Sequence, residues 1–362
     1  MIRAIGKSWR DSASLIVLSK RSPNGISSSD TGDSNYDILL QTRTVDASFS
    51  KGVVFPGGVS EEADASEHWL HLLSSFGFGQ SDFETLHRAG TTITPIFADN
   101  PIKRHIALRI TAIRETFEEL GLLICSSKQK DNRNDILWTN VIADIDVKHW
   151  QKRVSEDPSE LLSLCKEHNC YPDIWSLYYW SNWLSPIHIK TRFDTAFFVA
   201  ALENKPASIK ANSEVVNVEW ASTLATLEAN RQSKLQLYPP QGYELHRLSK
   251  FNDLEKLTNF AKERSSKGDE LFYPMRIEVN DGTLYTFPGD YLYPANLDLI
   301  NTPVVKENKT ILELRGTYKS LHRLETTHDQ KTVLVTQNYT PKYHINMGNE
   351  ITPLNIKVHN IK

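Results

Sequence analysis

Three glutamates occur within five residues of one another, at Glu115, Glu118 and Glu119. On a helix, which turns by about 100 degrees per residue, these positions fall within an arc of about 100 degrees. Carboxylates this close repel one another, and hard divalent cations prefer oxygen ligands of this kind. The spacing therefore predicts either a site for a cation such as Mg²⁺ or a solvated acidic face balanced by Lys and Arg side chains.

The helix that would carry these glutamates is expected between Asn100 and Gly121. Asn100 followed by Pro101 is typical of a helix N-terminus, and a glycine is typical of the residue after a helix. Between them, apolar residues recur every three or four positions, at Ile102, Ile106, Ile110, Ile113, Phe117 and Leu120. From Ile106 onward they fall at about 140 to 220 degrees from Glu115. We therefore expect the acidic side of the helix to face away from the core.

The residues around the glutamates follow the pattern of the Nudix box. Residues 114–122 read Arg-Glu-Thr-Phe-Glu-Glu-Leu-Gly-Leu, similar to the second half of that box, and Gly58 resembles its opening glycine. Asp64 stands where the family has Glu, and 49 residues separate it from Arg114 where the family has seven, an insertion of 42 within residues 65–113. A box split in this way resembles that of the Nudix type 19 acyl-coenzyme A diphosphatases.

Other segments resemble the same branch in order, so that the likeness covers roughly residues 10–300; these segments are 36–58, 192–198, 214–216, 239–244 and 287–290. The resemblance implies an α/β Nudix sandwich with a mixed sheet between helices, in a domain of residues 1–240 with the split box at 58–64 and 114–122. An α+β C-terminal extension of residues 241–362 would follow. Within it, strands are expected at 311–314, 319–324 and 332–337, and a hairpin turn at Asn280-Asp281-Gly282.

The resemblance also implies an activity, the metal-dependent hydrolysis of the phosphoanhydride of coenzyme A or acyl-coenzyme A. The products would be 3',5'-ADP and 4'-phosphopantetheine or its acylated form, with Mg²⁺ or Mn²⁺ as the cofactor. Cations held by carboxylates would neutralise the diphosphate, whose charge otherwise repels an attacking water. The implied metal ligands are Glu115, Glu118 and Glu119, and Arg114 would orient them through ion pairs. The general base stays open among Glu118, which is preferred, Glu214, Asp64, Glu61 and Glu62.

Candidate substrate contacts are less specific. Arg43, Lys51 and Arg192 are placed where this fold would present phosphate-binding side chains, and Gly57 and Gly58 would permit close backbone approach. Solvation at the surface is the alternative for each cation. Two aromatic groups are candidates for an acyl channel, with core packing as the alternative: Trp69, Leu70, Leu73 and Phe76, and Trp175, Tyr178, Tyr179, Trp180 and Trp183.

Composition excludes several classes of protein. Lys and Arg total 41 against 44 Asp and Glu, a net charge of -3, which gives no long-range attraction to DNA. Three cysteines favour a reducing compartment. Cys165 and Cys170 flank His168, but a fourth metal ligand is missing. This segment is therefore interpreted as the end of a helix rather than as a metal site. No apolar run approaches the roughly 18 residues of a membrane span.

Other readings remain open from the sequence. The chain could be a Nudix diphosphatase for ADP-ribose, NADH or an RNA cap, or a catalytically silent module that binds nucleotides. The terminal targeting signals are unclear, so that a peroxisome or mitochondrion is implied by the family resemblance alone and the cytosol stays possible. The oligomeric state is not predicted.

Overall fold

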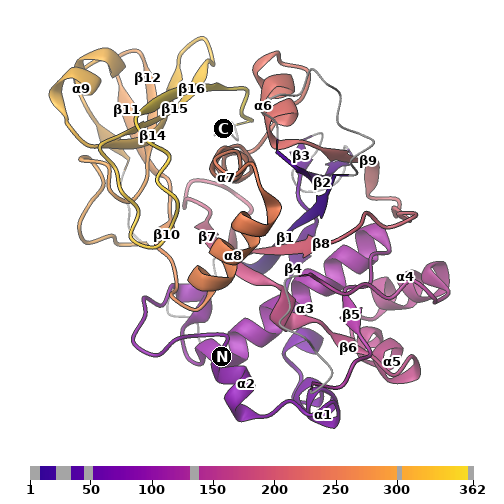
Figure 1. Ribbon diagram of the computed structural model, residues 1–362. Coiled ribbons are helices and arrows are strands. Elements are labelled where there is room, and N and C mark those ends of the chain that lie inside the picture. The colour runs from indigo at the N-terminus through magenta and orange to yellow at the C-terminus, as the bar shows by residue number, and fades with distance from the viewer. Residues whose placement is uncertain (1–8, 22–33, 45–51, 131–137, 300–303, 358–362) are drawn as a thin grey trace.

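The computed structural model describes residues 9–21, 34–44, 52–130, 138–299 and 304–357. Within them, an eight-stranded mixed sheet occupies the centre of the molecule (Figure 1). Its strands are β1 (Arg10–Lys20), β2 (Tyr36–Arg43), β3 (Val53–Val54), β4 (Gly57–Val59), β7 (Tyr178–Leu184), β8 (Phe193–Leu202), β9 (Val215–Ala221) and β10 (Leu271–Phe272). β1 pairs in parallel with β8 and antiparallel with β2 and β4. The mixed sheet and its helices confirm the predicted Nudix architecture.

Both faces of this sheet are covered, because successive side chains of β1 and β8 point into two different apolar cores. Leu15 and Val17 of β1 belong to a core that contains the helix α3 (Pro101–Leu120). Ile16 and Leu18 belong to a second core with α7 (Pro239–Leu248) and α8 (Leu254–Ser265). Side chains alternate along a strand, so an apolar run such as that of β1 fits a strand buried on both sides.

The helix α3 has the limits that the sequence predicts. The side chain of Asn100 accepts a hydrogen bond from the backbone N–H of Lys103, and Pro101 follows it. Gly121 adopts φ +67° and ends the helix, a left-handed conformation that glycine enters without strain. α3 is thereby fixed in length at both ends, and its last two turns carry the three glutamates.

The remaining helices surround this centre, with α1, α2, α4 and α5 on the α3 side (Figure 1). They are α1 (His68–Ser75), α2 (Gln80–Glu84), α4 (Val147–Glu156), α5 (Glu160–Glu167) and α6 (Thr223–Arg231), with short 3-10 turns η2 (Glu62–Ala65), η3 (Pro95–Phe97) and η5 (Ile174–Ser176). A two-stranded sheet joins β5 (Cys125–Ser126) to β6 (Tyr171–Pro172). Every helix in the described part of the chain is too short or too polar to cross a bilayer.

A second, six-stranded sheet forms most of the C-terminal extension. Its members, in spatial order, are β13 (Val305–Lys306), β11 (Met275–Val279), β12 (Gly282–Thr286), β14 (Leu321–Thr327), β15 (Thr332–Gln337) and β16 (Glu350–Leu354). β11 and β12 form the predicted hairpin. The strand predicted at 311–314 is wrong, because α9 (Ile311–Thr317) occupies it. Thr310 caps this helix and exchanges hydrogen bonds with Glu313, a local pattern that outweighs the apolar alternation.

The two sheets share one core. Leu324, Leu334 and Leu354 of the second sheet belong to the same cluster as Ile16 and Leu18 of the first. α7 contacts the first sheet through Glu244, a fully buried carboxylate that accepts hydrogen bonds from Trp180, Ser181 and Trp183 of β7. It contacts the second sheet through Tyr243, whose hydroxyl lies 2.7 Å from Nε2 of His322 in β14. The predicted boundary near residue 240 stays a prediction, and α7, which begins there, is anchored to the first sheet.

Candidate functional site

Arg114 is the centre of a buried ion-pair network. Its Nε and Nη2 donate to the two carboxylate oxygens of Asp64 at 2.8 and 3.0 Å. Its Nη1 donates to Glu115 at 3.0 Å and to Glu118 at 2.7 Å, and Nη2 also donates to the carbonyl of Val59. Burial lowers the pKa of Arg114, but the hydrogen bond and charge of Asp64, with the charges of Glu115 and Glu118, outweigh it and raise that pKa. Arg114 is therefore a permanent cation that positions the carboxylates around it.

Glu119 lies apart from Arg114 and has its own set of donors. Its carboxylate accepts hydrogen bonds from Gln41 Nε2 at 2.8 Å, Arg43 Nη2 at 2.6 Å and the backbone N–H of Gly57 at 3.0 Å. Gly57 has φ +147°, and a Cβ added there would meet the carbonyl oxygen of Ala13 at 2.3 Å. A glycine is required at this position because only an unsubstituted backbone can bring that N–H to Glu119.

The pKa values of Glu115, Glu118 and Glu119 are all raised by their surroundings. Burial raises the pKa of Glu115 to about 8; Arg114 opposes this rise, whereas the charges of Glu119 and Glu118 add to it. Burial likewise raises the pKa of Glu118 and of Glu119. A buried carboxylate surrounded by like charges favours its protonated form unless positive charge is supplied.

The acidic side of α3 does not face solvent, contrary to expectation. Side-chain exposure is 16% for Glu115, 15% for Glu118 and 3% for Glu119. β4 covers this side, and a Cβ added at Gly58 would lie 2.4 Å from the carboxylate carbon of Glu115. The helical wheel gives the direction of each side chain relative to the others, but it does not show which surrounding segment covers it.

A cavity of about 590 Å³ opens next to the glutamates. Gly57, Gly58, Glu115, Arg43 and Glu214 belong to its lining, so the structure brings together five of the residues predicted for the site. Arg43 Nη2 bridges Glu119 and Glu214, the latter at 3.2 Å, and the Glu214 side chain is 59% exposed. Apolar side chains form much of the remaining lining. They include residues of β7, β8, the start of α7 and the second sheet, namely Trp183, Leu184, Phe193, Phe197, Tyr238, Pro239, Tyr285 and Leu324, and β1 adds Ser12, Ala13 and Ser14.

Other predicted site residues lie elsewhere. Arg192 is absent from the cavity lining, since its Nη1 donates to the carbonyl of Ile187 at 2.7 Å and its guanidinium lies 5.3 Å from the ring centre of Trp9. Lys51 falls outside the described residues. Asp64, one of the alternative bases, is buried beside Arg114 and accepts further hydrogen bonds from Thr111 and the N–H of Glu61. These contacts hold Asp64 beside Arg114.

The cavity also includes residues that sequence reasoning missed. Arg10 and Lys357 supply two more cations to its lining, and Tyr285 reaches it from the second sheet. Arg10 opens β1, whose register next to β8 places it opposite Phe193. A parallel pairing of β1 with residues 183 positions later leaves no local signal in the sequence.

Of the two sets of residues predicted to line an acyl channel, most lie in the core and one residue lines the cavity. Trp69, Leu73 and Phe76 are buried in the α3 core. Of the second group, Trp183 alone belongs to the cavity lining, whereas Trp180 is fully buried against α8 and Trp175 stacks on Phe78. Core packing accounts for most of them, and the insertion contributes no residue to the lining of this cavity.

The donor set fits a hard divalent cation. Glu115, Glu118 and Glu119 offer only carboxylate oxygens, which is the ligand chemistry of Mg²⁺ and Mn²⁺. Their raised pKa values mean that added positive charge would favour the ionised form of all three. In the arrangement described, Glu115 and Glu118 share Arg114 while Glu119 faces Arg43, so an ion would compete with these two arginines for oxygen atoms.

Comparison with known proteins identifies the family. Residues 9–248 match the model of the NUDT19 Nudix domain, and residues 277–337 match that of the NUDT19 C-terminal domain. The chain is 35% identical over 373 residues to "Acyl-coenzyme A diphosphatase NUDT19" of Xenopus laevis, covering 94% of this chain and 96% of that protein. Identity to the Homo sapiens protein of the same name is 32%, covering 88% and 89%.

Solved structures agree with this likeness at the level of fold. A NUDIX hydrolase from Alicyclobacillus acidocaldarius superposes with a TM-score of 0.50 at 20% identity, covering 69% of this chain and 96% of that one. Nudix hydrolases generally use divalent metal ions, consistent with the oxygen-rich end of the cavity. The split box, the mixed sheet and these matches together place the chain in the NUDT19 family of Nudix hydrolases.

Proposed function

We propose that this protein hydrolyses the phosphoanhydride of coenzyme A and acyl-coenzyme A, releasing 3',5'-ADP and 4'-phosphopantetheine or its acylated form. The observation that carries the proposal is one cavity that joins the carboxylate end of α3 to an apolar wall. An acyl-coenzyme A has two matching parts: a polar, anionic diphosphate, which suits the end with carboxylates and cations, and an apolar acyl chain, which suits the apolar wall. The names of the relatives in Xenopus laevis and Homo sapiens support the same substrate class.

The metal would be Mg²⁺ or Mn²⁺, held by Glu115, Glu118 and Glu119. When bound, a cation of this kind neutralises phosphate oxygens and favours attack by water. Arg114 orients Glu115 and Glu118 through its Nη1, and Asp64 fixes Arg114 through the other side of the guanidinium. This arrangement keeps the carboxylates in place before substrate arrives, which lowers the reorganisation needed during reaction.

Phosphate binding would fall to the cations of the lining. Arg43 lies between Glu119 and Glu214, where its guanidinium can also reach an anion in the cavity. Arg10 and Lys357 are the further candidates for the 3'-phosphate. Guanidinium groups form bidentate hydrogen bonds with phosphate, and three cations around one cavity suit a substrate with several phosphate groups.

Glu214 is our proposal for the general base. Its carboxylate belongs to the cavity lining and is 59% exposed, so it is accessible to water, and Arg43 orients it. Glu118, the alternative, accepts a hydrogen bond from Arg114 and is absent from the lining. A base must come within about 3 Å of the water that it deprotonates, which favours the residue that reaches the cavity.

The apolar wall would bind the acyl chain. The lining contains Trp183 and Phe197 of the first sheet together with Tyr285 and Leu324 of the second, so the C-terminal extension helps to form the site. This supplies a reason for the extension to share a core with the Nudix sheet. The family resemblance further supports a peroxisomal or mitochondrial location, which imaging of the tagged chain would test.

A substrate panel tests the proposal. The purified chain is incubated with Mg²⁺ or Mn²⁺ and with coenzyme A, a long-chain acyl-coenzyme A, ADP-ribose, NADH or capped RNA, and the products are identified by mass spectrometry. We expect 3',5'-ADP from the first two at the highest kcat/KM. Turnover of ADP-ribose, NADH or cap alone would contradict the substrate class, and binding of nucleotides without turnover would contradict the enzymatic assignment.

A further inference from the structure

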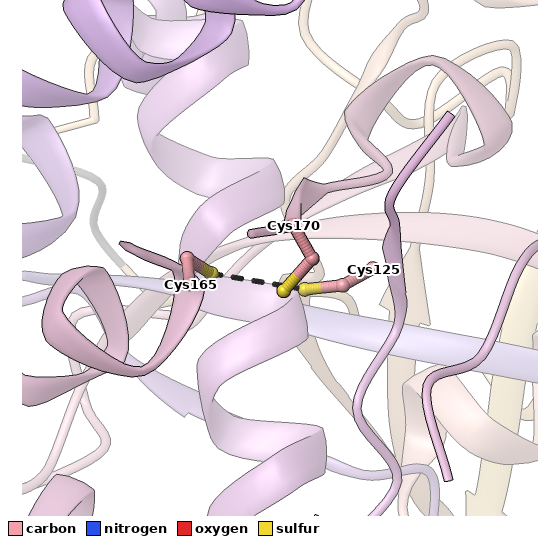
Figure 2. A group of neighbouring side chains, drawn as sticks. All are labelled: Cys125, Cys165 and Cys170. Carbon is pink, nitrogen blue, oxygen red and sulfur yellow. Dashed lines mark hydrogen bonds between the residues drawn. The ribbon is translucent and has the colours of Figure 1, made fainter. Parts of the chain in front are cut away.

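All three cysteines of the chain meet at one point, although Cys125 lies 40 residues before Cys165 in the sequence. Cys125 lies in β5, Cys165 in α5 and Cys170 directly before β6, and Figure 2 shows their sulfur atoms turned toward one another. All three are fully buried. Cys165 and Cys170 are close in the sequence, whereas Cys125 reaches them only through the pairing of β5 with β6.

The sulfur atoms are spaced as ligands of one metal ion would be. All three lie within 4.8 Å of one another, and Cys125 Sγ is 3.9 Å from Cys165 Sγ. A metal–sulfur bond of about 2.3 Å places two thiolates on one ion roughly 3.8 to 4 Å apart. This separation is about twice the length of a disulfide bond, and the three cysteines are free.

Backbone hydrogen bonds hold the three positions in place. β5 pairs antiparallel with β6, which sets Cys125 opposite Pro172, and the N–H of Asp173 donates to the carbonyl of Ile124. The N–H of Cys170 donates to the carbonyl of Cys165 at 2.9 Å, closing the turn after α5. The cluster is therefore preformed by main-chain contacts rather than by side-chain rotamers alone, as a tight metal site requires.

The surroundings select the class of ion. Within the described residues, no histidine or carboxylate joins the sulfurs at that distance, and His168, the nearest such residue in sequence, accepts a hydrogen bond from Trp150 at its Nε2. Sulfur ligands without oxygen favour thiophilic ions over Mg²⁺ or Mn²⁺. We propose that Cys125, Cys165 and Cys170 form a structural site for one thiophilic closed-shell ion, Zn²⁺ or Cu⁺.

This site is distinct from the glutamates of α3 in chemistry and in role. Full burial leaves no open coordination position for a substrate, which is the mark of a structural rather than a catalytic site. Each thiol that binds the ion loses its proton to solvent, so that loading is coupled to folding and to pH. Cys125 follows Glu119 by six residues, so an ion here would tie the chain leaving α3 to α5 and β6.

The metal content of the protein tests the proposal. The full chain is purified with a tag that needs no metal resin, and zinc and copper are measured per polypeptide. We expect about one equivalent of either ion in the wild type and in Val154→Ala, and neither ion in Cys165→Ala. Val154 is a matched control because it is fully buried in the same core cluster and carries no ligand atom. An equal metal content in Cys165→Ala and the wild type would overturn the proposal.

Reconstitution separates the two ions and covers the case of a variant that fails to fold. Metal-free wild type is titrated with Zn²⁺, or with Cu⁺ under anaerobic reducing conditions, while near-ultraviolet thiolate absorption and thermal stability are followed. We expect saturation at one equivalent, a higher midpoint of thermal unfolding, and binding more than about 100-fold weaker in Cys170→Ala, since loss of a ligand should exceed the roughly 10- to 100-fold cost of a lost supporting contact. Failure of the wild type to bind either ion would show that the cysteines serve only as packing.

Discussion

Arg114 and Asp64 form two parallel hydrogen bonds at 2.8 and 3.0 Å, although 49 residues separate them in the sequence. Both side chains are almost fully buried, at 2% and 1% exposure. The insertion between the two halves of the Nudix box therefore leaves the box intact in space. Because Asp64 accepts hydrogen bonds from Arg114, Thr111 and the N–H of Glu61, we propose that it positions the arginine rather than activating water.

Asp64→Asn should destabilise the fold. The substitution leaves Arg114 charged and buried with an incomplete set of partners, which typically costs roughly 3–5 kcal/mol. Chemical unfolding monitored by circular dichroism would measure the loss. Glu67→Gln, which breaks an exposed pair with Lys103, is the control and should leave the midpoint unchanged. A variant at Asp64 as stable as the wild type would show that the pair does not support the site.

Glu214→Gln should lower kcat with little change in KM. Removal of a general base typically costs about 10²- to 10⁴-fold in rate, and the amide keeps the shape of the side chain. Glu219→Gln, in the strand β9 that directly follows Glu214, is the control, since Glu219 is exposed and absent from the cavity lining. Steady-state kinetics would also compare Glu118→Gln, which should raise the metal concentration needed for activity. Normal kcat in Glu214→Gln would return the role of base to Glu118.

Tyr285→Ala should lower the ratio of kcat/KM for a long-chain acyl-coenzyme A to kcat/KM for coenzyme A. Tyr285 belongs to the second sheet and reaches the cavity lining, and loss of part of an aromatic contact is worth about 1–2 kcal/mol, or roughly tenfold. We expect kcat/KM to fall about tenfold for a long-chain acyl-coenzyme A and to stay near the wild-type value for coenzyme A. Tyr291→Ala, at an exposed tyrosine outside the lining, is the control. Equal losses for both substrates would remove the acyl assignment from this wall.

How much of the site can be read from the sequence depends on how local its signals are. The limits of α3 are predictable because Asn100, Pro101 and Gly121 act within one helical turn of each end. The hairpin at Asp281-Gly282 is predictable for the same reason. The prediction of a strand at 311–314 is wrong for a local reason too, because the capping pair Thr310 and Glu313 favours a helix more strongly than the alternation of apolar residues favours a strand.

Relationships between distant segments could not be predicted. The sequence alone gives no indication that Arg10 would enter the cavity, because β1 pairs with residues 183 positions later. It equally gives no indication that Arg192 would instead contact Ile187 and Trp9. Cys125 joins Cys165 and Cys170 through the pairing of two strands of two residues each, which are too short to be recognised.

Stability should fall as the pH drops below about 6.5. His322 is fully buried, with Nε2 2.7 Å from the hydroxyl of Tyr243 and Nδ1 2.6 Å from the carbonyl of Pro288, and burial lowers its pKa to about 3. The unfolded chain binds a proton there below about pH 6.5 while the folded chain does not, so acid favours unfolding between pH 6.5 and 3. Each such histidine contributes up to about 1.4 kcal/mol per pH unit.

His322→Gln should reduce this pH dependence. Urea unfolding at pH 7 and pH 5 would compare the difference in unfolding free energy with that of the wild type. The exposed His149→Gln is the control and should keep the wild-type slope. A slope unchanged by His322→Gln would mean that His322 does not stay neutral in the folded protein.

The most direct test is the release of 3',5'-ADP from coenzyme A as the concentration of Mg²⁺ or Mn²⁺ is varied, in the wild type and in Glu115→Gln. Glu115 is preferred over Glu119 because Glu119 also accepts three hydrogen bonds that support the fold. We expect activity only with the divalent ion, and a loss of about 10³-fold in the variant, since metal stabilisation of several kcal/mol changes the rate tenfold per 1.36 kcal/mol. Full activity in Glu115→Gln, or release of 3',5'-ADP that persists in chelator, would contradict the account.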